Sequence, residues 1–248
     1  MNLDFLAQYA LFAGAPLVRL TRLENQGYTN TNYLLESTKE HYLVRVFGKT
    51  SLNRSDEFKI GKKAFTKGIG QKPLLLDSAH QFMVIHFAKG AHCATPSQRQ
   101  LQQLARTLRT LHGIRHYQKP YDVAKAHRAS FGESFYTKRV LLFKKLRHFR
   151  YEPALCHHDL NPKNILFQEA AVRLIDWEYA RVHDRYFDLA SVIVEFGLGE
   201  NASRFFLQNY VTCKEKIDHK KLALYKKIYQ TLCQMWLEEY RQKGGKQR

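Results

Sequence analysis

The sequence predicts an α+β fold with a small antiparallel β-sheet lobe followed by a larger, mainly helical lobe. Apolar runs of strand-like composition fill the first third of the 248 residues, and apolar residues recur at helical spacing after residue 95. Lys89 and Gly90 break the pattern between these two regions. We therefore expect an N-terminal lobe over residues 1–88 and a C-terminal lobe over residues 89–248, with a hydrophobic content of 44% that suffices for a sizeable core.

The first lobe is expected to contain an amphipathic helix, five strands and a second helix. The N-terminal helix covers Phe5 to Leu17, a segment without the basic start of a signal peptide and too short to span a bilayer. The expected strands are 17–23, 33–36, 42–47, 74–76 and 82–87, with a polar turn at 37–41 and a helix at 54–67 that ends at Gly68 and Gly70. No transmembrane segment is predicted.

The second lobe begins with the clearest helix of the chain. Thr95 is the expected N-cap and Pro96 stands in the first turn, while Gly113 ends the run. The apolar face consists of Leu101, Leu104, Ala105, Leu108 and Leu111. From there to the C-terminus we expect mostly helix, except around residues 157–176.

The net charge of +18 favours polyanions as partners, whether nucleotide, nucleic acid or acidic membrane. Two basic clusters, at 138–150 and 214–227, are interrupted by apolar residues, as in helices with one solvated face. We favour that interpretation over a dedicated nucleic-acid surface. The four cysteines, Cys93, Cys156, Cys213 and Cys233, form no CxxC pair or zinc-ligand spacing, which fits a reducing, cytoplasmic compartment.

The most informative stretch combines His157, Asp159 and Asn164 with Asp176 after an apolar hairpin. Phosphoryl transfer needs a positioned acceptor hydroxyl and metal ions that neutralise phosphate charge. Asp159 can accept the hydroxyl proton, and Asn164 and Asp176 offer hard oxygen ligands to Mg²⁺. A chance match of polar loop residues is the simplest alternative. A metal site made of residues 156–159 is less favoured, because adjacent side chains cannot all point at one ion.

Arg45 lies in a predicted strand, and its fork-shaped guanidinium can bind two phosphate oxygens. Glu57, on the following helix, is the expected partner that holds it in place. The alternative is that Arg45 is an ordinary exposed strand residue.

These motifs resemble the aminoglycoside phosphotransferase and choline kinase branch of the protein-kinase-like superfamily. The resemblance is carried by His157, Asp159, Asn164 and Asp188, and by the segments 25–30, 42–48 and 174–180. Within this branch the choline and ethanolamine kinases are the most similar, and bacterial thiamine kinase also resembles the chain. The resemblance implies a two-lobed protein-kinase-like fold and covers most of the sequence.

The resemblance further implies ATP and Mg²⁺ as cofactors. The segment around Gly27, Thr29 and Asn30 looks like the loop that covers the phosphates, although it departs from a G-x-G-x-x-G pattern. Adenine is expected near the strand at 82–87, bound by backbone groups of residues 85–88, with Ile85 and Phe87 as contacts.

A cationic acceptor would need a carboxylate and aromatic faces. The expected contacts are Asn161, Glu178, Tyr179, Trp236 and Tyr240. For the aromatic residues of the last helix, simple core packing is the alternative. The basic C-terminal third disfavours a polycationic aminoglycoside. A protein substrate is not expected either, since no long segment separates Asp176 from Asp188.

The sequence thus predicts an ATP-dependent kinase that phosphorylates the hydroxyl of choline or ethanolamine. Thiamine kinase and aminoglycoside phosphotransferase are alternatives. A further alternative, from a different class, is a non-catalytic basic protein that binds nucleic acid or membranes on a kinase-like fold. Because the catalytic residues are all present, we do not expect nucleic acid to be the partner. The oligomeric state is not predicted.

Overall fold

The computed structural model describes residues 1–24, 30–49, 52–122, 125, 133–213 and 215–242. The chain forms two compact units. The first comprises Met1–Ala91 and Arg173–Glu178, and the second comprises His92–Val172 and Tyr179–Arg248. The lobe boundary expected at residues 88 and 89 stays a prediction.

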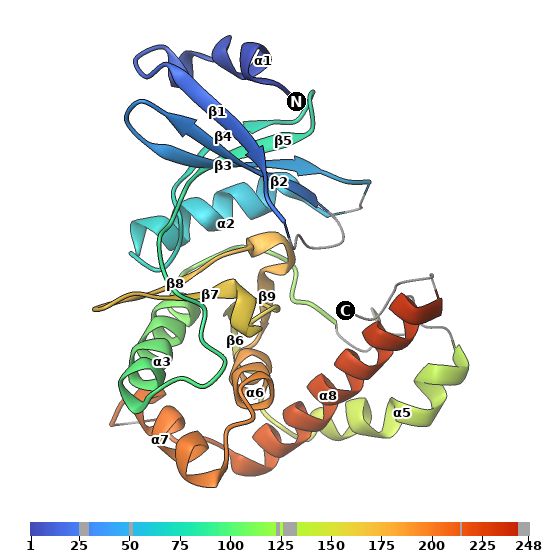
Figure 1. Cartoon of the computed structure of the whole chain (residues 1–248). Helices are drawn as coiled ribbons and strands as arrows, with labels where there is room; N and C mark the ends of the chain where they lie inside the picture. The colour runs from blue at the N-terminus through green and yellow to red at the C-terminus, as the bar shows by residue number, and fades with distance from the viewer. Residues whose placement is uncertain (25–29, 50–51, 123–124, 126–132, 214, 243–248) are drawn as a thin grey trace. The chain divides into compact units, whose positions relative to one another are not determined.

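A five-stranded antiparallel sheet is the centre of the first unit (Figure 1). Its strands are β1 (Leu17–Arg22), β2 (Asn30–Ser37), β3 (His41–Phe47), β4 (Pro73–Asp77) and β5 (Phe82–His86), in the order β1-β2-β3-β5-β4. All five predicted strands are present. The turn between β2 and β3 is stabilised by Ser37, whose hydroxyl oxygen accepts hydrogen bonds from the backbone N–H groups of Lys39 and Glu40.

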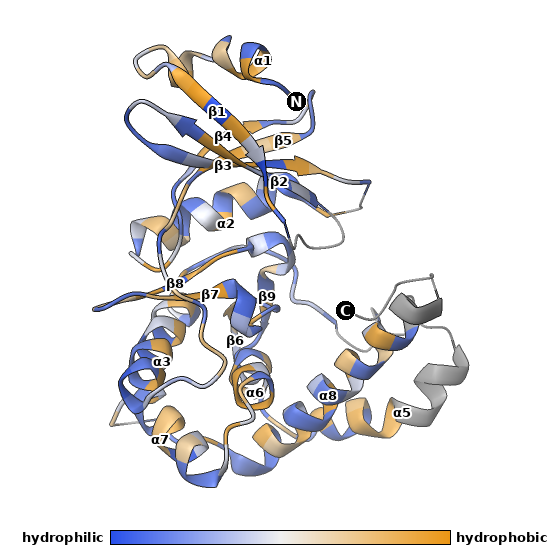
Figure 2. Ribbon diagram, viewed as in Figure 1, coloured by the Kyte–Doolittle hydropathy of each residue, from blue (hydrophilic) through white to orange (hydrophobic). Residues whose placement is uncertain are grey.

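The two faces of the sheet are covered by different helices. Tyr42 and Val44 of β3 pack with Leu6 and Phe12 of the N-terminal segment in one hydrophobic core. Because side chains alternate along a strand, Arg45 lies on the opposite face. There it meets Glu57 of α2 (Arg54–Thr66). The hydropathy colouring of Figure 2 shows the mixture of apolar and polar residues along these strands.

The prediction of a single N-terminal helix over residues 5–17 is wrong. The segment instead forms α1 (Leu3–Ala7), capped by Asn2, and a short 3₁₀ helix η1 (Ala10–Phe12). Between them Tyr9 adopts an extended backbone conformation, and its hydroxyl donates a 2.6 Å hydrogen bond to Asp77 at the end of β4. A tertiary contact therefore interrupts what the apolar pattern alone presents as one helix.

The second unit is mainly helical. Its helices are α3 (Gln98–His112), α5 (Glu133–Leu146), α6 (Tyr186–Glu195), α7 (Glu200–Tyr210) and α8 (His219–Gln242). Helix α3 packs on α7, and α8 packs on both α5 and α6. Two short antiparallel strands, β6 (Pro153–Cys156) and β9 (Arg181–Asp184), were not predicted. At four residues each they are too short for a periodic signal.

The start of α3 differs from the prediction. The N-cap is Ser97 and not Thr95. The Ser97 hydroxyl accepts from the backbone N–H of Gln100, and the Gln100 side chain accepts from the backbone N–H of Ser97. This reciprocal capping box satisfies two helix-end donors. Gly113 ends the helix as expected.

The motif-bearing segment forms a β-hairpin flanked by two 3₁₀ turns. The turn η2 (Pro162–Asn164) leads into β7 (Ile165–Phe167), and β8 (Val172–Leu174) leads towards η3 (Trp177–Tyr179). The chain passes from the second unit to the first within β8 and returns within η3. Among the helices of the described residues, none combines the length and the hydropathy that crossing a bilayer requires.

Candidate active site

Asp159 is the centre of a hydrogen-bonded loop in the second unit. One carboxylate oxygen accepts from the side-chain amide of Asn161 at 2.9 Å, and the other accepts from that of Asn164 at 2.7 Å. The Asn164 amide nitrogen also bonds the Asp159 carbonyl at 2.9 Å. This orientation leaves the Asn164 amide oxygen as the atom that could bind a metal ion.

The backbone of this loop is held by Asp188 of α6. The Asp188 carboxylate is fully buried and accepts from the N–H groups of His157, at 2.7 Å, and His158, at 3.1 Å. His158 has a φ of 69°, a left-handed conformation that a non-glycine residue adopts at some cost. The two backbone bonds to Asp188 fix the residue in this conformation, immediately before Asp159.

Asp188 is in turn contacted by His112 at the end of α3. The His112 Nε2 atom lies 3.3 Å from Asp188, and its Nδ1 atom lies 2.7 Å from the Tyr210 hydroxyl. With Cys156, His112 and Asp188 form a compact group of metal-binding atom types. Burial raises the pKa of the Cys156 thiol well above its ordinary value, and the Asp188 oxygens are occupied by backbone donors. These contacts support a structural role for the group.

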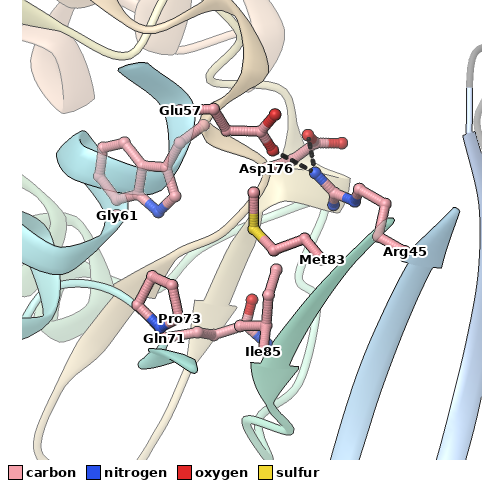
Figure 3. A pocket seen from close by; sticks show the side chains of 9 residues that line it. Arg45, Glu57, Gly61, Gln71, Pro73, Met83, Ile85 and Asp176 are labelled. Carbon is pink, nitrogen blue, oxygen red and sulfur yellow. Dashed lines mark hydrogen bonds and ion pairs between the residues drawn. The ribbon is translucent and has the colours of Figure 1, made fainter. Parts of the chain in front are cut away.

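In the first unit Arg45 forms two ion pairs (Figure 3). Its NH1 atom lies 2.9 Å from Glu57 and 2.8 Å from Asp176. Arg45 is only 4% exposed, so the alternative of an exposed strand residue is wrong. Burial by itself lowers the pKa of Arg45, but the carboxylates of Asp176 and Glu57 outweigh burial and raise that pKa overall. Arg45 is therefore a fixed positive charge beside Asp176.

Asp176 stands at a strained point of the backbone, with a φ of 66°. The next residue, Trp177, packs against two glycines that allow a close approach. A Cβ atom on Gly70 would lie 2.8 Å from Ala64 and 3.3 Å from the Trp177 ring, and one on Gly61 would lie 2.9 Å from Pro73. The Asp176 side chain stays 28% exposed, so its carboxylate can be reached from solvent.

The cavity next to Arg45 is lined by Arg45, Glu57, Gly61, Gln71, Pro73, Met83, Ile85, Asp176 and Trp177 (Figure 3). Its volume is about 10 Å³. That is room for a single water molecule, so this cavity is not the place of an adenine ring.

Only part of the predicted phosphate-covering loop belongs to the described residues. Gly27 and Thr29 lie outside the described residues. Asn30 is the first residue of β2, and its amide nitrogen donates to Glu178 at 2.8 Å. Glu178 also accepts from Arg54 at 3.0 Å. The side chains of Asn30 and Glu178 thus contact each other and Arg54, a residue that the sequence analysis did not single out.

The backbone after β5 was predicted to bind adenine. The N–H groups of His86 and Phe87 already donate to the carbonyls of Lys72 and His41, at 2.8 and 3.0 Å. Ile85 is buried and faces the small cavity beside Arg45. These two N–H groups are therefore already used within the first unit. The adenine contact itself stays a prediction.

Three of the predicted acceptor residues have the following described surroundings within the second unit. Asn161 uses its amide to bond Asp159 and the N–H of Lys163. The Tyr179 carbonyl accepts from Arg181, and Trp236 is 47% exposed on α8. The Tyr240 side chain lies outside the described side chains. Acceptor binding by these residues stays a prediction.

A cluster near Asp159 was missed by the sequence analysis. Glu195, at the end of α6, accepts a 2.7 Å hydrogen bond from the Tyr229 hydroxyl of α8. Phe187 stacks on the His158 ring with centroids 4.2 Å apart and meets the Tyr229 ring edge-on at 5.6 Å. Burial raises the pKa of Glu195, and the negative charge of Asp159 raises it further. A carboxylate and aromatic rings therefore lie beside the predicted base.

The sequence contains a weak signal for this cluster. Glu195 follows Asp188 by seven residues, which places both on one face of a helix. In the sequence alone Glu195 is one of several scattered acidic residues, and only the packing of α6 on α8 brings Tyr229 to it.

Comparison with known proteins identifies the family. Residues 20–225 match the model of the phosphotransferase enzyme family. The chain belongs to this family. The phosphotransferase assignment agrees with the catalytic loop and confirms the prediction of an enzyme.

Individual proteins are similar to this phosphotransferase along almost its whole length, one in sequence and two in structure. Protein LicA of Haemophilus influenzae is 25% identical over 244 residues, which are 87% of this chain and 91% of the relative. The crystal structure of choline kinase LicA from Streptococcus pneumoniae is similar with a TM-score of 0.82 and 22% identity, over 99% of this chain and 92% of that one. A structure of LicA in complex with AMP has a TM-score of 0.77 and 23% identity, over 94% and 87%. The predicted two-lobed, protein-kinase-like α+β fold is confirmed.

Proposed function

We propose that this phosphotransferase moves the terminal phosphate of ATP, with Mg²⁺, to the hydroxyl of a small amino alcohol, choline or ethanolamine. The observation that carries the proposal is the position of Glu195, a half-buried carboxylate that is bonded to Tyr229 and whose pKa is raised by burial and by the charge of Asp159. The likeness to a choline kinase structure over 99% of the chain supports the same acceptor class.

A cationic head group fits this cluster for physical reasons. The amine loses hydration when it enters a pocket, and one carboxylate together with aromatic faces replaces that hydration. Glu195 supplies the negative charge, and Tyr229 and Phe187 supply ring faces or edges. The acceptor hydroxyl would then point at Asp159, the nearest carboxylate of the catalytic loop.

Asp159 acts as the base in this proposal. Its two amide partners, Asn161 and Asn164, hold the carboxylate in one orientation, so that it can accept the proton of the attacking hydroxyl. The fixed orientation saves the reorganisation that a freely rotating side chain would need.

The residues present fit Mg²⁺, which prefers oxygen ligands. Asp176 offers a partly exposed carboxylate and Asn164 an amide oxygen. Bound there, the ion would neutralise charge on the phosphates. Arg45 adds a permanent positive charge next to Asp176, and AMP in the LicA complex supports a nucleotide as the donor.

The alternative acceptors are less well supported. A polycationic aminoglycoside needs several carboxylates on the acceptor side, whereas the cluster holds Glu195 and Asp159. Thiamine carries one permanent cation and a hydroxyl, so it stays the second candidate. The cytoplasmic location predicted from the cysteines stays a prediction.

The test is ATP turnover by the purified chain with choline, ethanolamine, thiamine and an aminoglycoside, each with Mg²⁺ and with a chelator. We expect choline or ethanolamine to give the highest kcat/KM and the chelator to abolish turnover. A preference for thiamine or the aminoglycoside would overturn the acceptor assignment. Absence of turnover with every acceptor, together with salt-sensitive polyanion binding, would favour the non-catalytic alternative.

A further inference from the structure

Asn30, Arg54 and Glu178 form a closed triangle of side-chain contacts in the first unit. The Asn30 amide nitrogen donates to Glu178 Oε2 at 2.8 Å, and Arg54 NH1 donates to the same oxygen at 3.0 Å. Arg54 NH2 completes the triangle by donating to the Asn30 amide oxygen at 2.8 Å. Each residue therefore holds the other two.

The triangle joins three segments that are far apart in the sequence. Asn30 begins β2, Arg54 begins α2, and Glu178 lies in η3, two residues after Asp176. The side chains of Arg54 and Glu178 are only 12% and 6% exposed. Solvent screening, which makes most surface ion pairs weak, is correspondingly reduced at this pair.

Arg54 has two further partners. Its NH1 atom lies 2.8 Å from Glu57, and its guanidinium lies 4.4 Å from the centre of the Phe47 ring. Glu57 pairs with Arg45, which pairs with Asp176. Arg54 is thus connected to Asp176 by two routes, through Glu178 along the backbone and through Glu57 and Arg45 by side chains.

We propose that Arg54 is a positioning residue for phosphoryl transfer. With Asn30 and Glu178 it holds the segment that carries Asp176 at the strained backbone angle of 66°, while it orients Glu57 towards Arg45. A residue at such an angle keeps its place only when the surroundings hold it. The proposal rests on the proposed function, because it assigns Arg54 to the residues that serve ATP and Mg²⁺.

The proposal differs from the view that Glu178 acts through its charge on the acceptor or on a metal ion. The two contacts that Glu178 makes in the triangle use the same oxygen, Oε2. Glu178→Gln keeps an oxygen that can accept both bonds but removes the charge, whereas Glu178→Ala removes both. The two variants therefore separate positioning from charge.

The first experiment compares the kinetics of Arg54→Met, Arg54→Lys, Glu178→Gln and Glu178→Ala. We expect Arg54→Met and Glu178→Ala to lower kcat by about tenfold or more, with the acceptor KM within about twofold of wild type. Glu178→Gln should stay within about threefold in kcat. Arg54→Lys should be intermediate, since an ammonium keeps the charge but not the forked geometry. Lys59→Met, on the exposed side of α2, is the matched control and should match wild type.

The second experiment measures hydrogen exchange of the amides at 173–178 without any ligand, so it is independent of turnover. Arg54→Met should raise these exchange rates by about tenfold, and Glu178→Gln should change them little. Circular dichroism checks whether Arg54→Met folds. If it does not, Asn30→Ala removes the two contacts of Asn30 and leaves the bond between Arg54 and Glu178. This variant should raise the exchange rates at 173–178 by less than about tenfold.

The two experiments distinguish failure of this proposal from failure of the proposed function. Unchanged exchange in Arg54→Met, or equal loss of kcat in Glu178→Gln and Glu178→Ala, would overturn the positioning role. A wild-type chain that phosphorylates no acceptor would overturn the proposed function, while the exchange measurement would still decide whether the triangle holds the segment.

Discussion

At the scale of single residues, the site depends on side chains whose environment changes their chemistry. Asp159 keeps both carboxylate oxygens bonded to amides, whereas Glu195 is half-buried beside a hydroxyl. In the proposed function the first arrangement orients a base, and the second places a negative charge where a cation can neutralise it. The two carboxylates are therefore expected to respond differently to substitution.

Asp159→Ala should lower kcat by at least about 100-fold, because it removes the group that accepts the hydroxyl proton. Nucleotide affinity should change little, since the hydrogen bonds that Asp159 accepts from Asn161 and Asn164 lie within its own loop. Turnover assays and calorimetric titration with a non-hydrolysable ATP analogue check both statements. Activity near wild type would rule out the role of base.

Glu195→Gln should raise the KM for choline by about tenfold, equivalent to about 1.4 kcal/mol, with a smaller effect on kcat. Because the pKa of Glu195 is raised, chiefly by burial, the wild-type KM should rise as the pH falls, at a higher pH than for an ordinary glutamate. The variant should lose this dependence. Glu200→Gln, on the exposed start of α7, is the control, and equal KM values in the two variants would contradict the assignment.

At the scale of elements, buried polar contacts decide where helices and strands are joined. Lys221 of α8 is 2% exposed and lies 2.7 Å from Asp184 of β9 and 3.1 Å from Glu152 beside β6. Its ammonium also donates to the Arg150 carbonyl at 2.7 Å. The long C-terminal helix is thus anchored at its first turn to the strands that precede and follow the catalytic segment.

Lys221→Met should lower the free energy of unfolding of the second unit by about 3–5 kcal/mol, because Asp184 would stay buried without its cation. Lys220→Met, at the exposed neighbouring position, should change it by less than about 0.5 kcal/mol. Urea unfolding followed by circular dichroism measures both. A similar midpoint for the two variants would show that the buried pair is not the anchor.

At the scale of the whole molecule, the high net charge of +18 coexists with a site that uses few exposed charges. The charged groups of the site are paired or bonded: Arg45 with Glu57 and Asp176, Arg54 with Glu178, and Asp159 with its amides. These charged groups are therefore largely neutralised by their partners.

Stability should fall as the pH decreases from about 6.5 to about 4. Burial lowers the pKa of His183 from 6.5 to about 4, so between these values the unfolded chain binds a proton that the folded chain does not. Above pH 6.5 the neutral form of His183 contributes its full stabilisation. By pH 4 about 3 kcal/mol of the free energy of unfolding is lost. His158, whose pKa is also lowered by burial, adds to the same trend.

Denaturant unfolding at pH 7.5 and pH 5 measures the loss. His183→Phe preserves an aromatic ring next to Phe187 and Tyr225 and should reduce the difference between the two pH values. If the variant and the wild type lose the same stability, His183 does not titrate as described.

The sequence by itself determined the strands of the first unit, the helix that ends at Gly113, and the motif of His157, Asp159 and Asn164 that predicts a catalytic loop. Each of these is local: alternation, helical spacing and the separation of His157, Asp159 and Asn164 are visible in a short window. The pairing of Arg45 with Glu57 was also predictable, because a strand residue and the next helix meet in this arrangement.

Only the tertiary structure decided the rest. Tyr9 breaks the N-terminal helix because Asp77, far along the chain, accepts its hydroxyl. Glu195 becomes part of the site because α8 brings Tyr229 to it, and Arg54 matters because β2 and η3 reach it. Contacts between residues distant in sequence leave no periodic trace, since each partner is an ordinary polar residue until the fold places it beside the other.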